Sequence, residues 1–325
     1  MKKDVWCFLI FAGLLICTSE MSGKKKPAVD FWPVEEHILR LIREIRLTKN
    51  DSLAIEKHRM IEEALAQTLT QPEAYRYPFD SLRMIGFLYA PHRQFRLINW
   101  NHSFRDGTHR YFAMIVVPEK QQPSRVIRLT DMSDTIRMPE FEPLAADEWY
   151  GALYYKIIRK RKAKDEKKYY TFLGVDMNNL DTKKKIVEVM AFEDDGTVRF
   201  GAPLFELNGR VKHRLIFEYS ARQAMYLEYK SFRRRIEYDH LSPLMPYYVG
   251  MYEYYEPDMY RDGLKFKRKR WKHYKNIVTP PKEKKLKKRS LPKPPKIKRP
   301  KPVKKQTEQP EKPVDPEDTT PMNNS

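Results

Sequence analysis

The sequence predicts a mainly β protein of the α+β class, with an antiparallel sheet domain that follows two N-terminal helices and precedes a disordered basic tail. Three observations predict it: apolar residues at helical spacing early in the chain, short β-rich segments between turn residues through its centre, and an end dominated by lysine and proline. The predicted units are a signal peptide (1–22), a linker (23–33), a helical pair (34–72), a β-rich domain (82–275) and the tail (279–325).

The first residues have the order of a secretory signal peptide. Lys2 and Lys3 give a positive start, the 13 residues from Val5 to Cys17 carry no charge, and polar residues return from Thr18. A helix needs about 20 apolar residues to span a bilayer, so this run favours a cleaved signal over an anchor. We therefore expect export across the inner membrane, to the periplasm, the outer envelope or the medium.

The only two cysteines, Cys7 and Cys17, lie inside this signal. After cleavage the chain can form no disulfide, thiolate metal site or cysteine nucleophile. Two alternatives would keep the protein at a membrane. One is acylation of Cys17, although Ile16 is larger than the residue that such processing prefers, and the other is retention of the whole signal.

Two amphipathic helices are expected before the sheet domain. The first has apolar residues at helical spacing with charged residues between them: Val34, Ile38, Leu41, Ile42 and Ile45. Cap-forming side chains at 50–52 open the second, whose apolar period continues to Leu69, shortly before Pro72.

From about Leu82 the pattern changes to short segments that predict antiparallel strands. They are MIGFLYA, FRLINW, RYFAMIVV, RVIRLT, WYGALYYKII, KYYTFLGV, KIVEVMAF, VRFGAPLF, RVKHRLIFEY, AMYLEY and RRIEYDHL. Residues 194–196 (DDG) predict a hairpin turn. Within 211–219 the odd-numbered residues are expected to be buried, and the even-numbered ones, Arg214 among them, to lie mostly in water. A sandwich and a barrel both fit the pattern.

Positive charge is concentrated near the C-terminus. The chain has a formal net charge of +20, and residues 265–305 hold 20 Lys and Arg against the single acid Glu283. From Thr279 onward almost nothing can be buried, which predicts an unfolded, extended segment. We expect its clustered cations to bind polyanions: Lys284, Lys285, Lys287, Lys288, Arg289, Lys293, Lys296, Lys298, Arg299 and Lys301.

The expected polyanionic partners are envelope components such as lipopolysaccharide or cell wall. A solvated linker without a partner is the alternative for this tail. No specific nucleic acid is predicted, because the tail lacks the interleaved aromatic residues that stack on bases.

Several segments, taken in order, carry a resemblance to a known family: FRLINW, DGTHRYFAMI, WYGALYYKII, YYTFLGVDMNN, KKKIVEVMAF, FGAPLFEL, RLIFEYSARQAMYLEY, IEYDHLSP and PDMYRDGLKFKRKRW. They cover most of Leu82 to Trp271 and resemble uncharacterised exported proteins from Bacteroidetes bacteria. The resemblance implies a β-rich exported domain, and it implies no activity, catalytic residue or ligand. The Lys/Pro tail is an addition to the family's usual ending, and GVDMNN (174–179) departs from its Gly-Trp-Asp-Gly-Asn-Asn-like turn.

Asp176, Asn178 and Asp181, in GVDMNNLDT, are weak candidates for calcium ligands. A calcium loop has a glutamate at its twelfth position, where this chain has Val187, and the loop glycine is missing. Asn and Asp also suit a turn between strands. We therefore expect a hairpin turn here, with no metal and no other cofactor.

Two polar segments contain catalytic residue types without the spacing that catalysis needs. They are Asp239, His240 and Ser242 in YDHLSP, and His102, Asp106 and His109 in NHSFRDGTH. The first lacks a nucleophile elbow, and the second lacks the spacing of a zinc site. We expect His240 to end a strand and the second segment to be a polar loop.

Six tyrosines cluster in PLMPYYVGMYEYYEPDMY: Tyr247, Tyr248, Tyr252, Tyr254, Tyr255 and Tyr260. Sheet packing is their expected role, because tyrosine fills half-buried strand positions well. An exposed aromatic patch, the alternative, would suit sugar or protein recognition.

Taken together, these patterns favour an exported, envelope-associated binding or structural protein that is not an enzyme and whose basic tail contacts anionic envelope material. The alternative is a hydrolase or carbohydrate-active enzyme with a site assembled from distant loops.

Overall fold

Two helices lie side by side ahead of the sheets: α1 (Trp32–Leu47) and α2 (Asp51–Leu69). In this computed structural model the described residues are 29–277, apart from 121, 162–167 and 208. Asn50 caps α2, since its Oδ1 accepts a hydrogen bond from the Leu53 amide at 3.1 Å. Apolar residues of both helices, including Ile38 and Leu65, enter one buried cluster. The predicted helical pair is confirmed.

The strands form three sheets, and the predicted antiparallel pairing is confirmed for every ladder between the named strands except that of β9 with β15. The first contains β1 (Gly86–Tyr89), β2 (Arg96–Ser103), β3 (His109–Val117) and β4 (Arg125–Thr130). The second contains β5 (Leu153–Arg161), β6 (Lys168–Asp176), β7 (Thr182–Phe192), β8 (Val198–Phe200) and β11 (Arg214–Ser220). The third contains β9 (Phe205–Leu207), β10 (Arg210–Lys212), β12 (Leu227–Lys230), β13 (Arg235–Pro243), β14 (Tyr255–Lys267) and β15 (Arg270–Tyr274).

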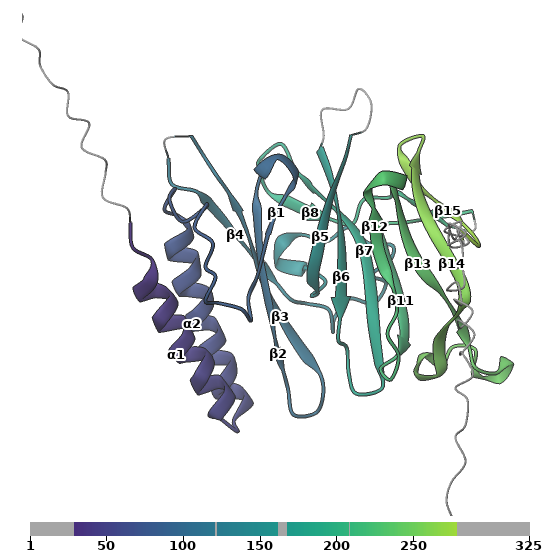
Figure 1. Ribbon diagram of the computed structural model, residues 1–325, viewed down its shortest axis with the longest axis horizontal. Helices are drawn as coiled ribbons and strands as arrows, with labels where there is room; N and C mark the ends of the chain where they lie inside the picture. Colours follow the sequence, from purple (N-terminus) through teal and green to yellow (C-terminus); the bar gives the residue numbers. More distant parts are fainter. Residues whose placement is uncertain (1–28, 121, 162–167, 208, 278–325) are drawn as a thin grey trace, which may run out of the picture. The chain divides into compact units, whose positions relative to one another are not determined.

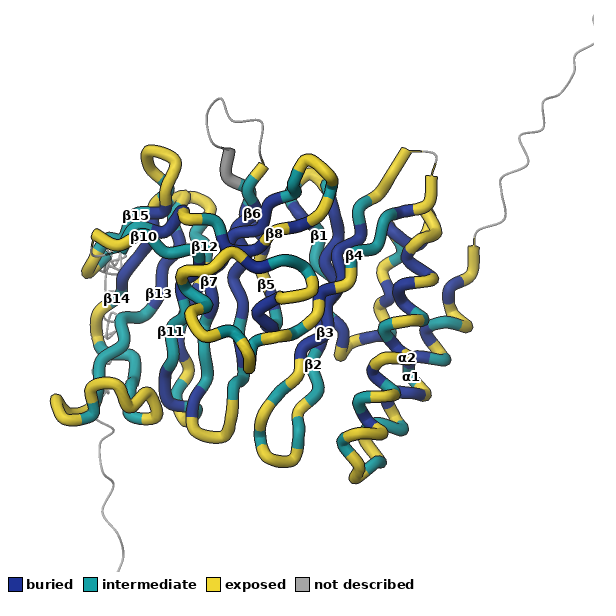
Figure 2. Tube along the Cα trace, turned by 180° about the vertical axis from the view of Figure 1, so that it is seen from behind, coloured by how far each residue is buried: buried dark blue, intermediate teal, exposed yellow. Residues whose placement is uncertain are grey.

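The helices and the three sheets are stacked as layers, with the helices against the first sheet (Figure 1). Side chains of β3 point alternately into two clusters: Phe112 and Met114 toward the helices, Ala113 and Ile115 toward the second sheet. The middle sheet is buried in the same way, because Ile186 enters one cluster and its neighbour Val187 another. Figure 2 shows the buried residues concentrated in the middle strands and the exposed ones in the connecting loops.

This two-sided burial explains an error in the predicted strand at 211–219. The chain changes sheets there, with β10 in the third sheet and β11 in the second, and His213 lies between them. Arg214, expected to lie in water, is fully buried because both faces of the second sheet are covered. The sheets are stacked open sheets with edges, so the structure favours the sandwich alternative.

The turn predicted between two strands is confirmed. The expected hairpin turn at 194–196 joins β7 to β8, and Gly196 has a φ of 83°, which glycine adopts without strain.

In the third sheet, the order β10-β9-β15-β14-β13-β12 places β15 in the interior, where it pairs parallel to β9. Within the described residues, neither helix has the length and apolar character that crossing a membrane requires.

Candidate ligand-binding site

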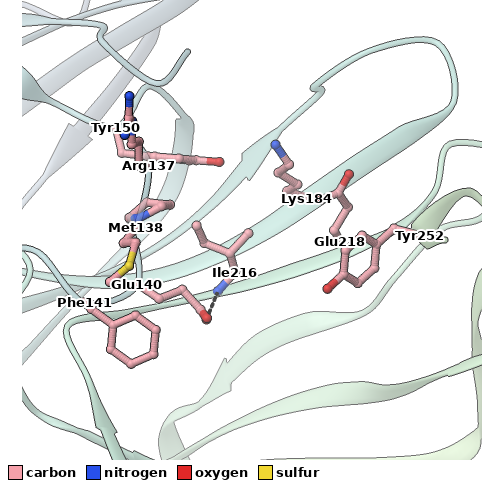
Figure 3. Close-up of a pocket in the computed structure, with 10 residues that line it drawn as sticks. Arg137, Met138, Glu140, Phe141, Tyr150, Lys184, Ile216, Glu218 and Tyr252 are labelled. Atoms are coloured by element: carbon pink, nitrogen blue, oxygen red, sulfur yellow. Dashed lines mark hydrogen bonds between the residues drawn. The ribbon is translucent and has the colours of Figure 1, made fainter. Parts of the chain in front are cut away.

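An open pocket of about 440 Å³ lies beside the second sheet, a size typical of small-molecule sites. Segments far apart in sequence line it: Arg137–Phe141, Tyr150, Lys184, Ile216, Glu218 and Tyr252. Figure 3 shows Arg137, Met138 and Phe141 on one side, Lys184, Glu218 and Tyr252 on the other, and Ile216 between them. We call the segment 137–142 the pocket loop.

Arg214 holds the pocket loop from inside the protein. Its Nη1 atom donates hydrogen bonds to the carbonyl oxygens of Pro139 and Glu142, the latter at 3.1 Å. Gly201 makes room for this contact, because a Cβ atom there would lie 2.9 Å from both Arg214 Nη2 and the Glu142 carbonyl oxygen. The loop is thus fixed to the sheet by a buried cation.

Glu140 attaches the same loop to β11 at a second point. Its carbonyl oxygen accepts from the His213 amide at 2.7 Å, and its Oε1 accepts from the Ile216 amide at 3.3 Å. Its other carboxylate oxygen, Oε2, is paired with Lys212 Nζ. Both the backbone and the side chain of Glu140 are therefore engaged in holding the loop.

Arg214 is itself paired with Glu188 inside the core. Arg214 Nε donates to Glu188 Oε2 at 3.0 Å, and both side chains are fully buried. Burial raises the pKa of Glu188, and the positive charge of Arg214 opposes that rise. The Tyr154 hydroxyl donates to Glu188 Oε1, and the Trp149 indole donates to the Tyr154 hydroxyl at 2.9 Å. One network thus runs from the core to the pocket loop.

The opposite wall rests on the turn between β6 and β7. Lys184 Nζ donates to Asn178 Oδ1 at 2.8 Å and lies 3.8 Å from Asp176 Oδ2. Glu218 Oε1 accepts from the Thr182 hydroxyl at 2.7 Å and from Asn178 Nδ2 at 3.4 Å. The turn therefore positions one cation and one anion at the pocket.

Asp176 is buried behind this wall and accepts hydrogen bonds from two tyrosine hydroxyls. Tyr111 donates to its Oδ1 at 2.8 Å, and Tyr150 donates to its Oδ2 at 3.4 Å. Burial raises the pKa of both tyrosines, and the charge of Asp176 raises it further. Both hydroxyls stay protonated and serve as donors.

The three weak metal candidates do not converge on one point. Asp176 is turned inward to the two tyrosines, Asn178 has the left-handed φ of 50°, and the Asp181 amide donates to Asn179 Oδ1 at 2.9 Å. These are the features of the predicted hairpin turn, which joins β6 to β7. Among the residues that the structure describes, no group of three or more His, Cys, Asp or Glu is arranged to hold a metal ion.

The β13–β14 connection is largely exposed (Figure 2), whereas Tyr255, at the start of β14, packs against a buried cluster as the sheet-packing prediction expects. Tyr247 is 69% exposed, and Tyr252 in the connection and Tyr260 in β14 are exposed as well. Tyr248 and Tyr254 stack with ring centroids 4.0 Å apart. The alternative of an exposed aromatic patch therefore holds for this connection, and Tyr252 joins it to the pocket.

Asp239 and His240 do not form a catalytic pair. Asp239 accepts from Arg261 and from the Tyr226 amide at 2.8 Å, whereas the His240 ring pairs with Asp258 at 2.7 Å. The prediction that His240 ends a strand is wrong, because β13 continues to Pro243. His240 lies instead at a register shift in the β13–β14 ladder, between the pairs Asp239–Arg261 and Leu241–Pro257.

Residues 104–108 form the predicted polar loop, which joins β2 to β3, whereas His102 and His109 lie in the strands themselves. His102 Nδ1 pairs with His58 Nε2 at 3.2 Å, and His109 Nδ1 pairs with Asn101 and with Ser103 at 3.0 Å each. Asp106 accepts from the amide and hydroxyl of Thr108 in the turn itself. The two histidines and Asp106 therefore serve separate contacts.

The predicted polyanion-binding residues, Lys284 to Lys301, lie outside the described residues. The basic run begins before them, in the β14–β15 hairpin, whose turn residues Arg268 and Lys269 both have positive φ. Glu206 is an acidic partner of this hairpin and lies 3.8 Å from Arg270 Nη1 and 3.1 Å from Lys272 Nζ. Folded structure thus carries part of the charge that the sequence assigned to the tail.

Sequence reasoning did not identify Arg137, Lys184 or Glu218 as residues of one site. Glu218 had a usable signal, because it lies with Ile216 on the face opposite Leu215, Phe217 and Tyr219, the face that the pattern predicts to be exposed. Nothing in the local sequence of Arg137 or Lys184 marks them, since the site forms only when the pocket loop packs on the second sheet.

In comparisons with known proteins, the chain matches no protein-family model, no curated protein and no solved structure.

Proposed function

We propose that this is an exported, non-enzymatic binding protein that takes a small ligand in the pocket shown in Figure 3. The observation that carries the proposal is the buried Arg214–Glu188 pair, in which Arg214 also donates from Nη1 to two carbonyl oxygens of the pocket loop. Burying an ion pair is a weak way to stabilise a fold. Using one to fix a loop suits a binding site, because a preorganised wall loses less entropy when a ligand binds.

The contacts that Glu140 and Lys184 already make within the protein support ligand binding over acid–base catalysis. Glu140 is paired with Lys212 and bonded to the Ile216 amide, and Lys184 is bonded to Asn178. A general acid or base must exchange its proton with a substrate at hydrogen-bond distance. Residues held in this way serve better as fixed charges around a ligand.

Export belongs to the proposal on sequence grounds. The charged start, the uncharged run from Val5 to Cys17 and the confinement of both cysteines to that region support it. The proposed location is the periplasm or outer envelope, and the resemblance to exported Bacteroidetes proteins is consistent with this location.

The pocket can be tested by filling it. The full chain would be screened by thermal shift against sugars, amino acids, short peptides and cell-wall fragments. We expect Met138→Trp, on the pocket loop, to abolish ligand-induced shifts, whereas the control Met132→Trp, outside the pocket lining, retains them. Equal ligand shifts in the two variants would contradict the assignment.

A second proposed function is contact between the basic tail and anionic envelope material. It is supported by the 13 Lys and Arg against the single acid Glu283 within residues 279–305. In the full chain, Lys284, Lys285 and Lys287 replaced by serine should weaken binding to lipopolysaccharide micelles and reduce its salt dependence. Serine at the exposed Lys49, Lys120 and Lys156 is the charge-matched control. The proposal fails if both triple variants bind as the parent does.

A further inference from the structure

The arrangement of charges in the pocket identifies a ligand class, and this step rests on the proposed binding function. We propose that the pocket binds a zwitterionic amino acid or short peptide with an apolar side chain. Four charged side chains line the pocket, and what each of them already contacts decides which remain for a ligand.

Two of the four are neutralised by the protein. Glu140 is paired with Lys212, and Lys184 lies 3.8 Å from the Asp176 carboxylate and donates to Asn178. Their charges are therefore largely compensated before any ligand arrives.

The other two, Arg137 and Glu218, form no ion pair with any described residue. Arg137 is exposed and makes no hydrogen bond within the described part of the chain, so its guanidinium group can take a carboxylate in two parallel hydrogen bonds. Glu218 uses Oε1 for Thr182 and Asn178, and no described residue donates to its Oε2. That oxygen can accept from an ammonium group.

Arg137 and Glu218 lie on opposite sides of the pocket, with Ile216 between them (Figure 3). A ligand with one charge would leave one of the two unmatched, whereas an amino acid or peptide presents an ammonium and a carboxylate together. Met138, Phe141 and Tyr252 add apolar surface around Ile216, which suits an apolar side chain. Charge and surface therefore indicate the same ligand class.

Isothermal titration of the full chain tests both ends of the ligand separately. The probes are L-phenylalanine, its N-acetyl derivative without the ammonium, its amide without the carboxylate, and the dipeptide Phe-Phe. We expect removal of either charge to weaken binding about tenfold or more. Comparison of L-phenylalanine with Phe-Phe tells an amino-acid site from a peptide site.

Variants assign each charge to its residue. Arg137→Ala should weaken L-phenylalanine about tenfold and leave the amide unchanged, whereas Glu218→Gln should weaken L-phenylalanine and leave the N-acetyl derivative unchanged. Arg76→Ala, an exposed arginine outside the pocket, is the control. Glutamine keeps the acceptor oxygen for Thr182, and the exposed Arg137 can be changed without disturbing the core.

The inference is overturned if neither L-phenylalanine nor Phe-Phe binds, or if the capped derivatives bind as tightly as the free ones. In either case the binding function survives if another ligand shifts the parent and Met138→Trp abolishes that shift. The two ideas therefore fail through different results.

Discussion

At the scale of single residues, hydrogen bonds fix the proton positions on the buried His58 and its neighbour His102. The Trp100 indole donates to His58 Nδ1 at 3.2 Å, and an indole nitrogen can only donate. His58 Nδ1 must therefore accept, so its proton is on Nε2 and is donated to His102 Nδ1 at 3.2 Å. His102 Nε2 faces Asp51 Oδ1 at 3.7 Å. The neutral His58 ring thus joins α2 to β2.

This arrangement predicts acid sensitivity. Burial, with the neighbouring His102, lowers the pKa of His58 to about 4, from an ordinary value of about 6.5. Between these pH values the unfolded chain binds the extra proton and the folded chain does not, so stability falls as pH drops from about 6.5 to about 4. Above about pH 6.5 His58 is neutral in both the folded and the unfolded chain, so this loss of stability is absent.

The parent should lose unfolding free energy between pH 7 and pH 4, and we expect His58→Asn to reduce this loss by up to about 3 kcal/mol. The measurement is the free energy of urea unfolding at pH 7 and pH 4 for the parent and the variant. The same pH dependence in both proteins would assign the loss to other groups.

A second prediction concerns the buried pair beneath the pocket. Arg214→Met should cost about 3–5 kcal/mol of unfolding free energy, because it leaves Glu188 buried without its partner. Arg128→Met is the matched control, since Arg128 and Glu63 are about half exposed, and its cost should stay below about 1 kcal/mol. Urea unfolding of both variants provides the comparison, and similar losses would contradict the role given to Arg214.

Residue-scale prediction failed where burial depends on neighbouring layers. Arg214 alternates with apolar residues in the sequence, a pattern that places it in water if only one face of the sheet is covered. The second sheet is covered on both faces, and the arginine is buried with Glu188 from β7. The two residues lie 26 positions apart, so no local pattern connects them.

At the scale of elements, the β14–β15 turn has residues that its geometry disfavours. Arg268 and Lys269 have φ values of 47° and 66°, in the region that Asn and Gly adopt most readily in two-residue hairpin turns. We therefore expect Arg268→Asn to raise the unfolding free energy by about 0.5 kcal/mol, measured by urea titration. A lower stability would show that the arginine makes a stabilising contact in solution.

The elements that the sequence predicts well are those defined by nearby residues. The helical pair follows from apolar spacing and the Asn50 cap, and the turns at 176–182 and 194–196 follow from Asn, Asp and Gly. Assignment of strands to sheets is different, because pairing partners such as β9 and β15 are separated by more than 60 residues in the chain. The pocket belongs to this second kind of feature, since its walls meet only through tertiary packing.

At the scale of the whole molecule, each of the three buried clusters contains one tryptophan: Trp100, Trp149 and Trp271. Neighbouring clusters share a sheet, so loss of one cluster exposes a face of the next. We therefore expect the folded body to unfold in one cooperative transition. Full-length protein labelled with 5-fluorotryptophan would report it by ¹⁹F NMR, with the native resonances of these three tryptophans, among the five in the chain, vanishing at the same urea concentration. Earlier loss of the Trp100 signal would show that the helical layer unfolds separately.

The interior position of β15 affects how the protein is made. A chain that emerges from the ribosome or a translocation channel presents β9 and β10 long before β15, yet β9 depends on β15 for its link to the rest of the sheet. Until the segment Arg270–Tyr274 emerges, Phe205 lacks its partner Trp271 and the last cluster stays open. The folded body can therefore close only after β15 has been made, and the strands made before it must wait for this one segment.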